Sequence, residues 1–557
     1  MQHRSSILDP FVAPFRRFVD SDWALFPKSL KSLRMPIMVA VAYYIGAQMA
    51  FAVGTLSDRI IAPFWPPNVV LFCALIFAPK RQWWWYIAAA FPAHVIAEHA
   101  VQMPAGQMLV AFVTNCALAL LNAYGLRWFL KERPWLGTLS NSSIYILITA
   151  AAGPAIAALG GAFVQILSTN NVQHYWTAWG NWYLSNALGF VTLGSVFLTW
   201  FDRRSQNERW NSRRTAEACV LALSLGTVCA VVFHFGGGQV QSGFLPALLY
   251  CPIPLLLWAA IRFGQRGASG AILVVTIVSI WQNLREPTVF IVGSIDQNVL
   301  ALQVFLMCLA VSVFLLGAAI DELGRTGDAM RELAGALLRV QDEERRRIAR
   351  ELHDSTGQNL AVAGLTLNRI KEQVPESCGA AVEELDDILR QSMVEIRTVS
   401  YLLHPPMLDG IGFDIALRAY VGGFSKRTGI SVELSLPPNT GRMPSTVELV
   451  LFRIVQEALT NVWRHSGSST ARIHLSQIST NGNPQVTLSI EDFGKGIPSR
   501  IRATTLSSSR RPVPVGLGLV GMRERLHQIG GALEIDSVSG KTVIRAIVKL
   551  NSPVHAN

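Results

Sequence analysis

Long apolar runs dominate the chain up to about residue 320 and then stop. We count ten such runs between residues 35 and 320, separated by short polar loops. A helix needs about 20 apolar residues to cross a bilayer, and most of the runs reach that length. The pattern predicts a polytopic α-helical membrane domain with eight to ten spans. The expected cores lie at 35–54, 63–78, 83–101, 107–130, 142–167, 176–200, 215–236, 244–263, 268–284 and 298–320.

Lysine and arginine occupy alternate loops of this half, which is the positive-inside pattern. With the N-terminus in the cytoplasm, an even number of spans returns the chain to the cytoplasm at Asp321. Membrane topology thereby explains much of the net charge of +11, and we expect no direct binding to nucleic acid. The first 34 residues have no apolar core, so we expect no cleaved signal peptide.

Polar and aromatic side chains gather towards the predicted outer ends of two of these runs. Trp65 and Asn68 open the second run, and His94 and Glu98 lie near the end of the third. Ionisable residues at membrane depth are costly and often functional, which makes these four residues a candidate sensor pocket. The alternative is that the aromatic rings anchor the interface and that the ionisable groups lie in the headgroup layer.

Two short motifs carry a resemblance for this half. They are FWPPN at residues 64–68, which opens the second run, and WYLSNALG at 182–189 in the sixth. Over residues 35–320 the sequence resembles the bacterial membrane-associated sensor domain of the first type, an integral sensor fused to signalling enzymes. The resemblance implies that this half senses an unknown ligand or membrane partner, without naming the stimulus.

The chain contains no proline between Asn298 and Pro375, and helix formers dominate the second part of that stretch. Apolar residues recur there at three- and four-residue steps, which is typical of an amphipathic helix in a bundle. The last span could therefore continue as one long helix, with Gly324 and Gly327 as candidate interruptions. A second stripe follows over 385–403. The resulting hairpin has too narrow a stripe for a core of its own, so we predict a homodimer with a four-helix bundle.

A histidine in the first helix of this hairpin is followed at once by a carboxylate. His353 lies about 100° around a 3.6-residue helix from Leu352, a residue of the stripe, and is therefore reachable by solvent. Asp354 can accept a proton from one ring nitrogen while the other attacks a phosphoryl group. By itself such a pair is more often an exposed polar surface, and the case for catalysis depends on the sequence that follows.

Beyond residue 405 helical and strand periods alternate, which predicts an α+β domain with helices on one face of a mixed sheet. The sequence contains neither a Walker-type phosphate loop nor a Cys-x-x-Cys spacing, so neither P-loop chemistry nor a zinc site is supported. We expect helices at 413–428, 445–465 and 517–529, and strands at 430–436, 470–478, 485–492, 531–537 and 541–550.

The first polar cluster in this domain suits a phosphate that carries magnesium. Glu457 and Asn461 are four residues apart and therefore share a helix face. A carboxylate and an amide oxygen so placed suit a hydrated Mg²⁺, and Arg464 and His465 add positive charge nearby. A solvated helix face is the alternative.

Two glycine-containing clusters follow. Asp492 ends an apolar strand and can accept from an adenine amino group, while Gly494 and Gly496 let the backbone approach a ligand. A Ser- and Arg-rich segment, with the composition of a mobile lid, then leads to Gly516 and Gly518 at a helix start, which favours phosphate. Alone, the first cluster could be a turn and the second a helix entry, but their order and spacing after a His-Asp hairpin indicate a nucleotide site.

In this order the motifs resemble those of two-component sensor histidine kinases of the nitrate/nitrite and hexose-phosphate sensor class, over about residues 335–550. The ATPase fold of that class is the GHKL or Bergerat fold of gyrase, the Hsp90 chaperones and MutL. The resemblance implies that His353 is the phosphoacceptor, Asp354 its base, and Gln358 the residue that positions water for dephosphorylation. It also implies that ATP and Mg²⁺ bind at Glu457, Asn461, Arg464, His465, Asp492, Gly494, Gly496, Gly516, Gly518 and Thr542.

We therefore expect a sensor histidine kinase in the bacterial inner membrane, with its kinase domains in the cytoplasm. Its phosphoryl group would pass to a separate response regulator of the helix-turn-helix DNA-binding type, which the same chain would also dephosphorylate. A non-catalytic receptor or transporter-like protein with an ATP-switched domain is the alternative. A third interpretation keeps the kinase and makes the membrane half a docking surface for a transporter-like partner. The expected segments are an N-terminal cytoplasmic segment (1–34), a membrane sensor domain (35–320), a helical linker (321–340), a dimerisation and phosphotransfer domain (341–404), an ATP-binding domain (405–551) and a tail (552–557).

Overall fold

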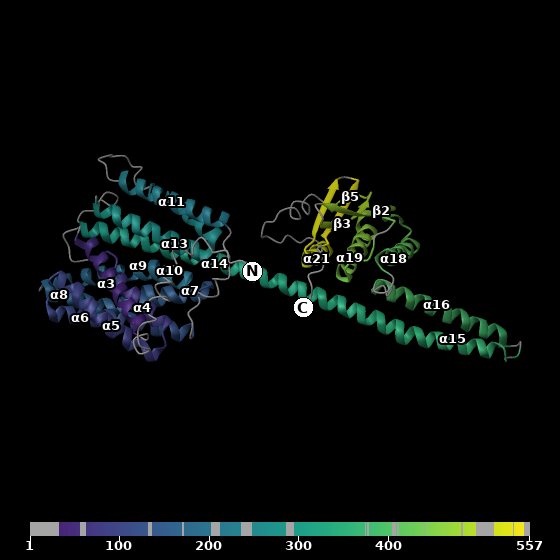
Figure 1. The fold of residues 1–557 in the computed structure, drawn as a ribbon, viewed down its shortest axis with the longest axis horizontal. Coiled ribbons are helices and arrows are strands. Elements are labelled where there is room, and N and C mark those ends of the chain that lie inside the picture. Colours follow the sequence, from purple (N-terminus) through teal and green to yellow (C-terminus); the bar gives the residue numbers. More distant parts are fainter. Residues whose placement is uncertain are drawn as a thin grey trace. The chain divides into compact units, whose positions relative to one another are not determined.

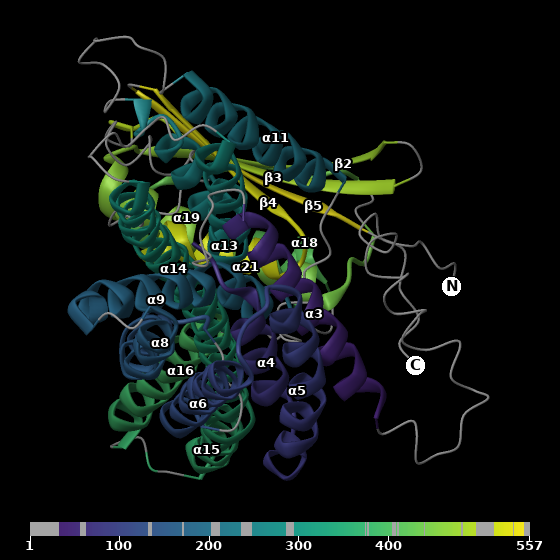
Figure 2. The same ribbon diagram turned by 90° about the vertical axis from the view of Figure 1, so that its left-hand side faces the viewer.

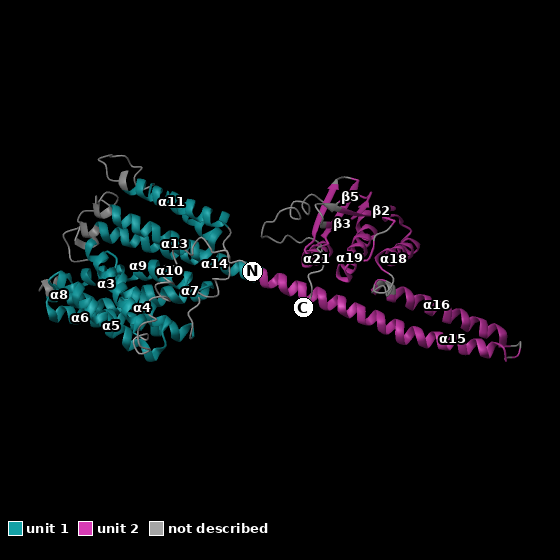
Figure 3. Ribbon diagram, viewed as in Figure 1, with its two compact units in different colours: residues 1–327 teal, residues 328–557 magenta. Residues whose placement is uncertain are grey.

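The computed structural model divides the chain into two compact units, residues 1–327 and 328–557, which we describe separately (Figure 3). The predicted lid and Gly516 lie outside the described residues, as do most of the segment 1–34 and the tail 552–557. The structure describes residues 33–55, 63–131, 136–169, 172–201, 212–235, 248–285, 295–373, 375, 378–403, 408, 412–438, 441–480, 483–496, 517–538 and 540–550.

The first unit consists of helices that follow the apolar runs of the sequence (Figure 1). Six described segments are long and apolar enough to cross a membrane by length and composition, so this is a multi-pass membrane protein, as predicted. The helices are α3 (Arg34–Thr55), α4 (Pro66–Phe77), α5 (Trp83–Ala100), α6 (Ala105–Phe129), α7 (Leu139–Ile146), α8 (Gly153–Thr169), α9 (Tyr175–Gly189), α10 (Ser195–Trp200), α11 (Ser212–Phe235), α13 (Ile253–Arg285) and the first part of α14 (Ile295–Glu351).

Within the described residues each of the ten expected cores coincides with helix, yet the six long segments are fewer than the cores. One reason is that α4 has 12 residues, too few to cross alone. Another is that α13 holds both the eighth and the ninth core, with an interruption at Gly264 (φ 62°, ψ −147°). The fifth and sixth cores each contain a π-helical turn, η2 (Leu147–Ala152) and η4 (Phe190–Gly194).

Large apolar side chains fill the interior of the first unit where α4, α5 and α6 lie side by side (Figures 1 and 2). Phe72 of α4 is fully buried and meets Phe190 edge to face, with ring centroids 5.3 Å apart. Leu118 and Leu126 of α6 are also fully buried. This packing holds the polar residues of the candidate sensor pocket between the helices.

The second unit begins with one uninterrupted helix. Helix α14 passes through Gly324 and Gly327 without a break and continues into the π-helical turn η6 (Leu352–Gly357) and α15 (Gln358–Lys371). Helix α16 (Gly379–Leu403) packs against α15 to complete the predicted hairpin (Figure 1). Other apolar side chains of the hairpin are exposed in the single chain, at Val362 and Leu365 of α15 and at Leu385 and Ile388 of α16.

The ATPase-like domain is a five-stranded mixed sheet in the order β1-β2-β3-β5-β4. Strand β1 runs parallel to β2, and the other neighbouring pairs are antiparallel. Its core packs Leu451, Phe452 and Val455 of one helix against Ile473 and Leu488 of the sheet, as the predicted α+β domain requires. The elements are α18 (Phe413–Thr428), β1 (Ser431–Ser435), α19 (Ser445–Asn461), η8 (Val462–Ser466), β2 (Thr470–Thr480), β3 (Asn483–Asp492), α21 (Leu517–Gln528), β4 (Ala532–Val538) and β5 (Lys541–Lys549).

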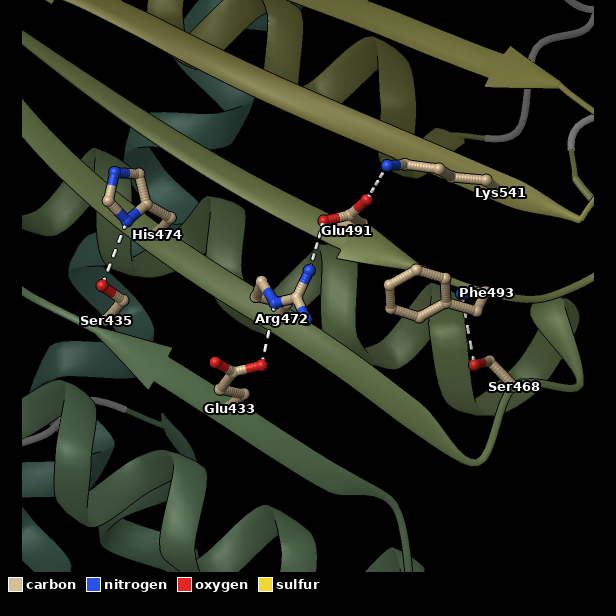
Figure 4. A network of polar contacts seen from close by, with 8 residues as sticks. All are labelled: Glu433, Ser435, Ser468, Arg472, His474, Glu491, Phe493 and Lys541. Carbon is tan, nitrogen blue, oxygen red and sulfur yellow. Dashed lines mark hydrogen bonds and ion pairs between the residues drawn. The ribbon is translucent and has the colours of Figure 1, made fainter.

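The opposite face of the sheet is polar, as period-two alternation dictates. On this face Arg472 lies between two carboxylates, with its nitrogens 2.8 Å from Glu433 and 3.4 Å from Glu491 (Figure 4). Lys541 also pairs with Glu491, and His474 contacts Ser435 at 3.2 Å. Since the two partners of Arg472 come from the neighbouring strands, these pairs run across the sheet.

Candidate functional site

The predicted phosphoacceptor lies in the π-helical turn between α14 and α15. His353, Asp354 and Gln358 are all exposed, so each is open to solvent and to a partner domain. In an ordinary helix residues five apart point about 140° away from each other, but the i to i+5 pairing of a π turn brings them nearer to one face. The widened turn therefore draws Gln358 towards the side of His353, an arrangement that the 3.6-residue period did not predict.

The charged run before this turn is organised by local ion pairs. Arg347 lies 2.6 Å from Glu344, three residues earlier, and 3.0 Å from Glu351, four residues later. All three side chains are at least half exposed. Exposed pairs of this kind contribute little to stability, because water and salt screen the attraction. These arginine and glutamate side chains form a solvated helix face.

Helix α19 positions the residues predicted to bind magnesium and phosphate. At its N-terminus the buried carboxylate of Glu448 accepts from the backbone N–H of Met443 (3.0 Å) and pairs with Arg442 (3.2 Å). One helical face then carries Glu457 and Asn461, both half-buried. A Cβ added at Gly518 would overlap the Oε1 atom of Glu457, so the helix start at Gly518 lies directly against this carboxylate. The fold thus brings together residues 61 positions apart (518 − 457).

The predicted adenine-contacting carboxylate is tied down at the end of β3. Asp492 is 8% exposed and accepts from the backbone N–H of Gly494 at 3.0 Å. It also accepts hydrogen bonds from the side chains of Thr542 and Ser466, and it faces Thr542 in the register of β3 and β5. Burial raises the pKa of Asp492 above its ordinary value, against the lowering effect of these donors. The carboxyl group is therefore held rigidly in a partly desolvated position.

The glycines around Asp492 allow a close backbone approach. A Cβ at Gly494 would collide with the carbonyl group of Ser466, which also accepts from the N–H of Lys495 at 3.0 Å. Gly496 has a φ of +78°, a left-handed conformation that other residues rarely adopt. Arg464 and His465 lie in the turn η8 beyond Asn461 and are exposed, so they flank the cluster instead of lining its buried part.

The donor set at this edge of the domain suits a nucleotide with magnesium. In the part of the chain that is described, no group of three or more His, Cys, Asp or Glu side chains could hold a metal by itself. The oxygens of Glu457 and Asn461 match Mg²⁺, which keeps several waters and binds through few protein ligands and substrate phosphates. A metal held here would therefore need a bound phosphate to complete its shell.

A second polar cluster lies inside the membrane unit. The amide of Asn68 donates to Asn115 at 2.9 Å and to Asn186 at 2.7 Å, which links α4, α6 and α9. All three asparagines are buried. Trp65, one turn earlier, is half-buried and meets Phe51 edge to face. Asn115 and Asn186 were missed as candidates, although a polar amide within an apolar run is the signal that would have found them.

The ionisable pair of the candidate sensor pocket is buried as well. His94 contacts the hydroxyl of Tyr43 at 3.4 Å and the carbonyl of Met108 at 3.1 Å. Glu98 lies 3.8 Å from His94 and is 3% exposed, and its Oε2 atom has no hydrogen-bond partner among the described residues. Asn115 donates to Tyr43 at 3.4 Å and joins this pair to the asparagine cluster. Three of the four predicted residues, Asn68, His94 and Glu98, are thus connected through Asn115 and Tyr43, and Trp65 lies one turn before Asn68.

An exposed His-Asp pair on a helical hairpin, followed by a GHKL-type ATP-binding domain, defines the architecture of a sensor histidine kinase. Sequence models of three families match the chain. They are MASE1 over residues 35–323, the HisKA_3 histidine kinase family over 344–408, and the histidine kinase-, DNA gyrase B-, and HSP90-like ATPase family over 446–552. The chain therefore belongs to the MASE1 family, and its C-terminal half matches the HisKA_3 and histidine kinase-like ATPase families, as its motifs predicted.

Several curated proteins are similar to the C-terminal half. The sensor histidine kinase MctS of Rhizobium johnstonii is 32% identical over 231 residues, which is 41% of this chain and 48% of that protein. The signal transduction histidine-protein kinase/phosphatase DegS of Brevibacillus brevis is 32% identical, over 38% of this chain and 53% of that protein. The oxygen sensor histidine kinase NreB of Staphylococcus carnosus is 29% identical, over 40% and 60%. The chain spans about half the length of these relatives.

Among solved structures, the histidine kinase domain of a blue-light activated histidine kinase from Erythrobacter litoralis matches at 16% identity. The match covers 35% of this chain and 94% of that one, with a TM-score of 0.23. The histidine kinase AdeS of Acinetobacter baumannii matches at 14% identity over 36% of this chain and 98% of that one, with a TM-score of 0.20.

Proposed function

We propose that this chain is a membrane-bound two-component sensor histidine kinase, an ATP:protein-L-histidine phosphotransferase. The observation that carries the proposal is the assembled nucleotide site. Glu457 lies against Gly518, and Asp492 is bonded to Thr542 and Gly494, in the same unit as the exposed His353. These residues come from separate stretches of sequence, and the fold brings them together. An ordinary polar surface does not require such a convergence.

In this reaction one ring nitrogen of His353 attacks the γ-phosphorus of ATP. An N–P bond forms as the bond from phosphorus to the bridging oxygen breaks, and ADP leaves with that electron pair. Asp354, adjacent and exposed, accepts the proton from the other ring nitrogen. Mg²⁺, if held by Glu457 and Asn461, would neutralise charge on the phosphates. Asp492 would accept from the adenine amino group.

The phosphoryl group would then pass to a separate response regulator, which we propose to be of the helix-turn-helix DNA-binding type. The same chain would dephosphorylate that regulator by positioning water with Gln358, which the π-helical turn brings towards His353. The exposed apolar side chains on α15 and α16 support a homodimer with a four-helix bundle. We place these domains in the cytoplasm and the first unit in the bacterial inner membrane.

The test is radiolabelling of the fragment 321–557 with γ-labelled ATP. We expect acid-labile, alkali-stable label that disappears in His353→Gln, whereas the neighbouring exposed Ser355→Ala control keeps it. Absence of label, or label that persists in His353→Gln, would favour a non-catalytic receptor or transporter-like protein whose ATP domain only switches conformation.

For the membrane unit we propose that the cluster around Asn68, His94 and Glu98, with Trp65 beside it, receives the stimulus. Burial of a carboxylate with one unpartnered oxygen among the described residues is costly and favours a functional role. Glu98→Gln should abolish the response while ATP affinity is unchanged, and the exposed neighbour His99→Gln should respond normally. If both variants respond normally but signalling requires a co-purifying transporter-like protein, the membrane half is a docking surface instead.

A further inference from the structure

One carboxylate on α14 holds both helices that carry the nucleotide-site residues. Asp342 lies 3.1 Å from the Nε of Arg453 on α19 and accepts from the Nε of Arg525 on α21 at 3.2 Å. Its side chain is 16% exposed, and those of the two arginines are 2% and 12% exposed. We call Asp342, Arg453 and Arg525 the linker latch.

The latch reaches the nucleotide site through two short helical segments. Arg453 precedes Glu457 by four residues, one turn of α19. Arg525 follows Gly518 by seven residues, about two turns of α21. Because Gly518 itself lies against Glu457, a movement of α14 at Asp342 acts on both α19 and α21 where they meet at the nucleotide site.

A glycine on the same face of α14 supports this docking. Gly335 lies seven residues before Asp342, and residues seven apart in a helix differ by only about 20° in direction. A Cβ at Gly335 would come within 2.8 Å of Gln528 and 3.4 Å of Glu524, both on α21. The tips of the Gln528 and Glu524 side chains on α21 therefore reach α14 on the face that also carries Asp342.

Arg453 depends on this contact for its charge balance. It is deeply buried, donates to the carbonyl of Leu403 at 2.9 Å and to Gln456 at 2.7 Å, and has Asp342 as its carboxylate partner. Burial lowers the pKa of Arg453 to about 10, and the charge of Asp342 opposes that effect. Removing one partner of a buried ion pair leaves an uncompensated charge, so the docked arrangement is sensitive to the position of Asp342.

The docked position is displaced from the phosphoacceptor. Asp342 precedes His353 by 11 residues (353 − 342), which is about 16 Å along a helix. The η6 turn that contains His353 packs against α15 and α16, and His353 itself is exposed. The contacts at Asp342, Gly335 and Leu403 all lie on the N-terminal side of His353 or at the end of α16.

We propose that the linker latch is an autoinhibitory contact. While Asp342 pairs with Arg453 and Arg525, the ATP-binding domain stays on the linker part of α14. A shift of α14 that separates these groups frees the domain to carry ATP to His353. Since α14 is one helix from Ile295 to Glu351, a displacement begun in its apolar segment moves Asp342 directly. This inference depends on the kinase activity proposed above.

The test is autophosphorylation of the full chain in lipid nanodiscs with γ-labelled ATP and no stimulus. Asp342→Asn keeps the shape of the side chain and removes its charge, and we expect the initial rate to rise at least about fivefold, the lower end of typical coupling between sites. The matched control is Asp328→Asn on the same helix, an exposed residue paired with Arg331, whose rate should not change. Asp342→Glu should stay near the basal rate.

A rise in rate cannot result from misfolding, and affinity for a fluorescent ATP analogue confirms that the domain is intact. If Asp342→Asn binds no analogue, Arg525→Gln, which removes the α21 partner of Asp342 and leaves Arg453 paired, must show the rise instead. Equal rates in Asp342→Asn and Asp328→Asn, or loss of label with normal analogue binding, would overturn the latch. Absence of label in the unaltered chain would overturn the kinase proposal itself.

Discussion

Because Gly494 lies close to Ser466, we predict that Gly494→Ala lowers the stability of the domain. An exposed helical glycine replaced by alanine usually has the opposite effect. A Cβ at Gly494 would lie 2.7 Å from both the carbonyl carbon and the Cβ of Ser466, and closer still to the carbonyl oxygen. Backbone atoms cannot rotate away, so the chain must shift. Overpacking of this kind costs about 1–3 kcal/mol.

The same shift would disturb the nucleotide site. The N–H of Gly494 donates to Asp492, and the next N–H donates to Ser466. If the 1–3 kcal/mol appears in binding, affinity for ATP falls by about 5- to 150-fold. A matched control is Gly422→Ala in α18, where no atom lies within 4 Å of the added Cβ. An exposed helical glycine replaced by alanine stabilises by about 0.5–1 kcal/mol.

Both effects can be measured on the fragment 328–557, which contains the complete core of the domain. Urea unfolding should give a lower midpoint for Gly494→Ala and a higher midpoint for Gly422→Ala. Titration with a fluorescent ATP analogue should show weaker binding for the first and unchanged binding for the second. If Gly494→Ala unfolds at the original urea concentration and binds the analogue normally, the close approach does not exist.

Three further predictions follow from individual side chains. Burial raises the pKa of Asp492, so its favourable contribution to stability is present below the unfolded-state pKa of 3.8 and is lost as pH rises through the folded-state pKa. Asp492→Asn should therefore raise the urea midpoint at pH 7 and show a smaller difference from the unaltered chain near pH 4. The same variant should abolish binding of the ATP analogue. Phe452→Ala should lower the free energy of unfolding by about 3–5 kcal/mol, measured by urea denaturation, because Phe452 is fully buried. Gly518→Ala should weaken analogue binding with little change in the urea midpoint, because its Cβ would meet the movable carboxylate of Glu457; an unchanged affinity would contradict the juxtaposition of these two residues.

Most elements of the ATPase-like domain were predictable because their periodicity is strong. The strand expected at 485–492 is β3 (Asn483–Asp492), and the helix expected at 445–465 is α19 with the turn η8. The turn at His353 was not predictable, since a 3.6-residue period assumes a regular helix and a π turn depends on local packing. The residue could be identified, but the relation of Gln358 to it could not.

The linker latch shows why contacts are harder to predict than elements. Asp342 and Arg525 are 183 residues apart, and each lies in a charged helical stretch that resembles a solvated face. The same limit applies in the membrane unit, where Asn68 and Asn186 are 118 residues apart. Period and composition identify the face of a helix, whereas the partner of that face is set by packing between distant segments.

The asparagine cluster of the membrane unit and the linker latch have one property in common. Each is a set of buried polar groups joined across several helices, and each depends on every member for its hydrogen bonds or charge balance. Such networks have a few discrete arrangements because a half-satisfied network is costly. In both proposals, ligand contact at Asn68 and Glu98 and release at Asp342 are therefore switches between packed states. A graded response of kinase rate to stimulus would then reflect the fraction of molecules in each state and not a gradual bend of α14.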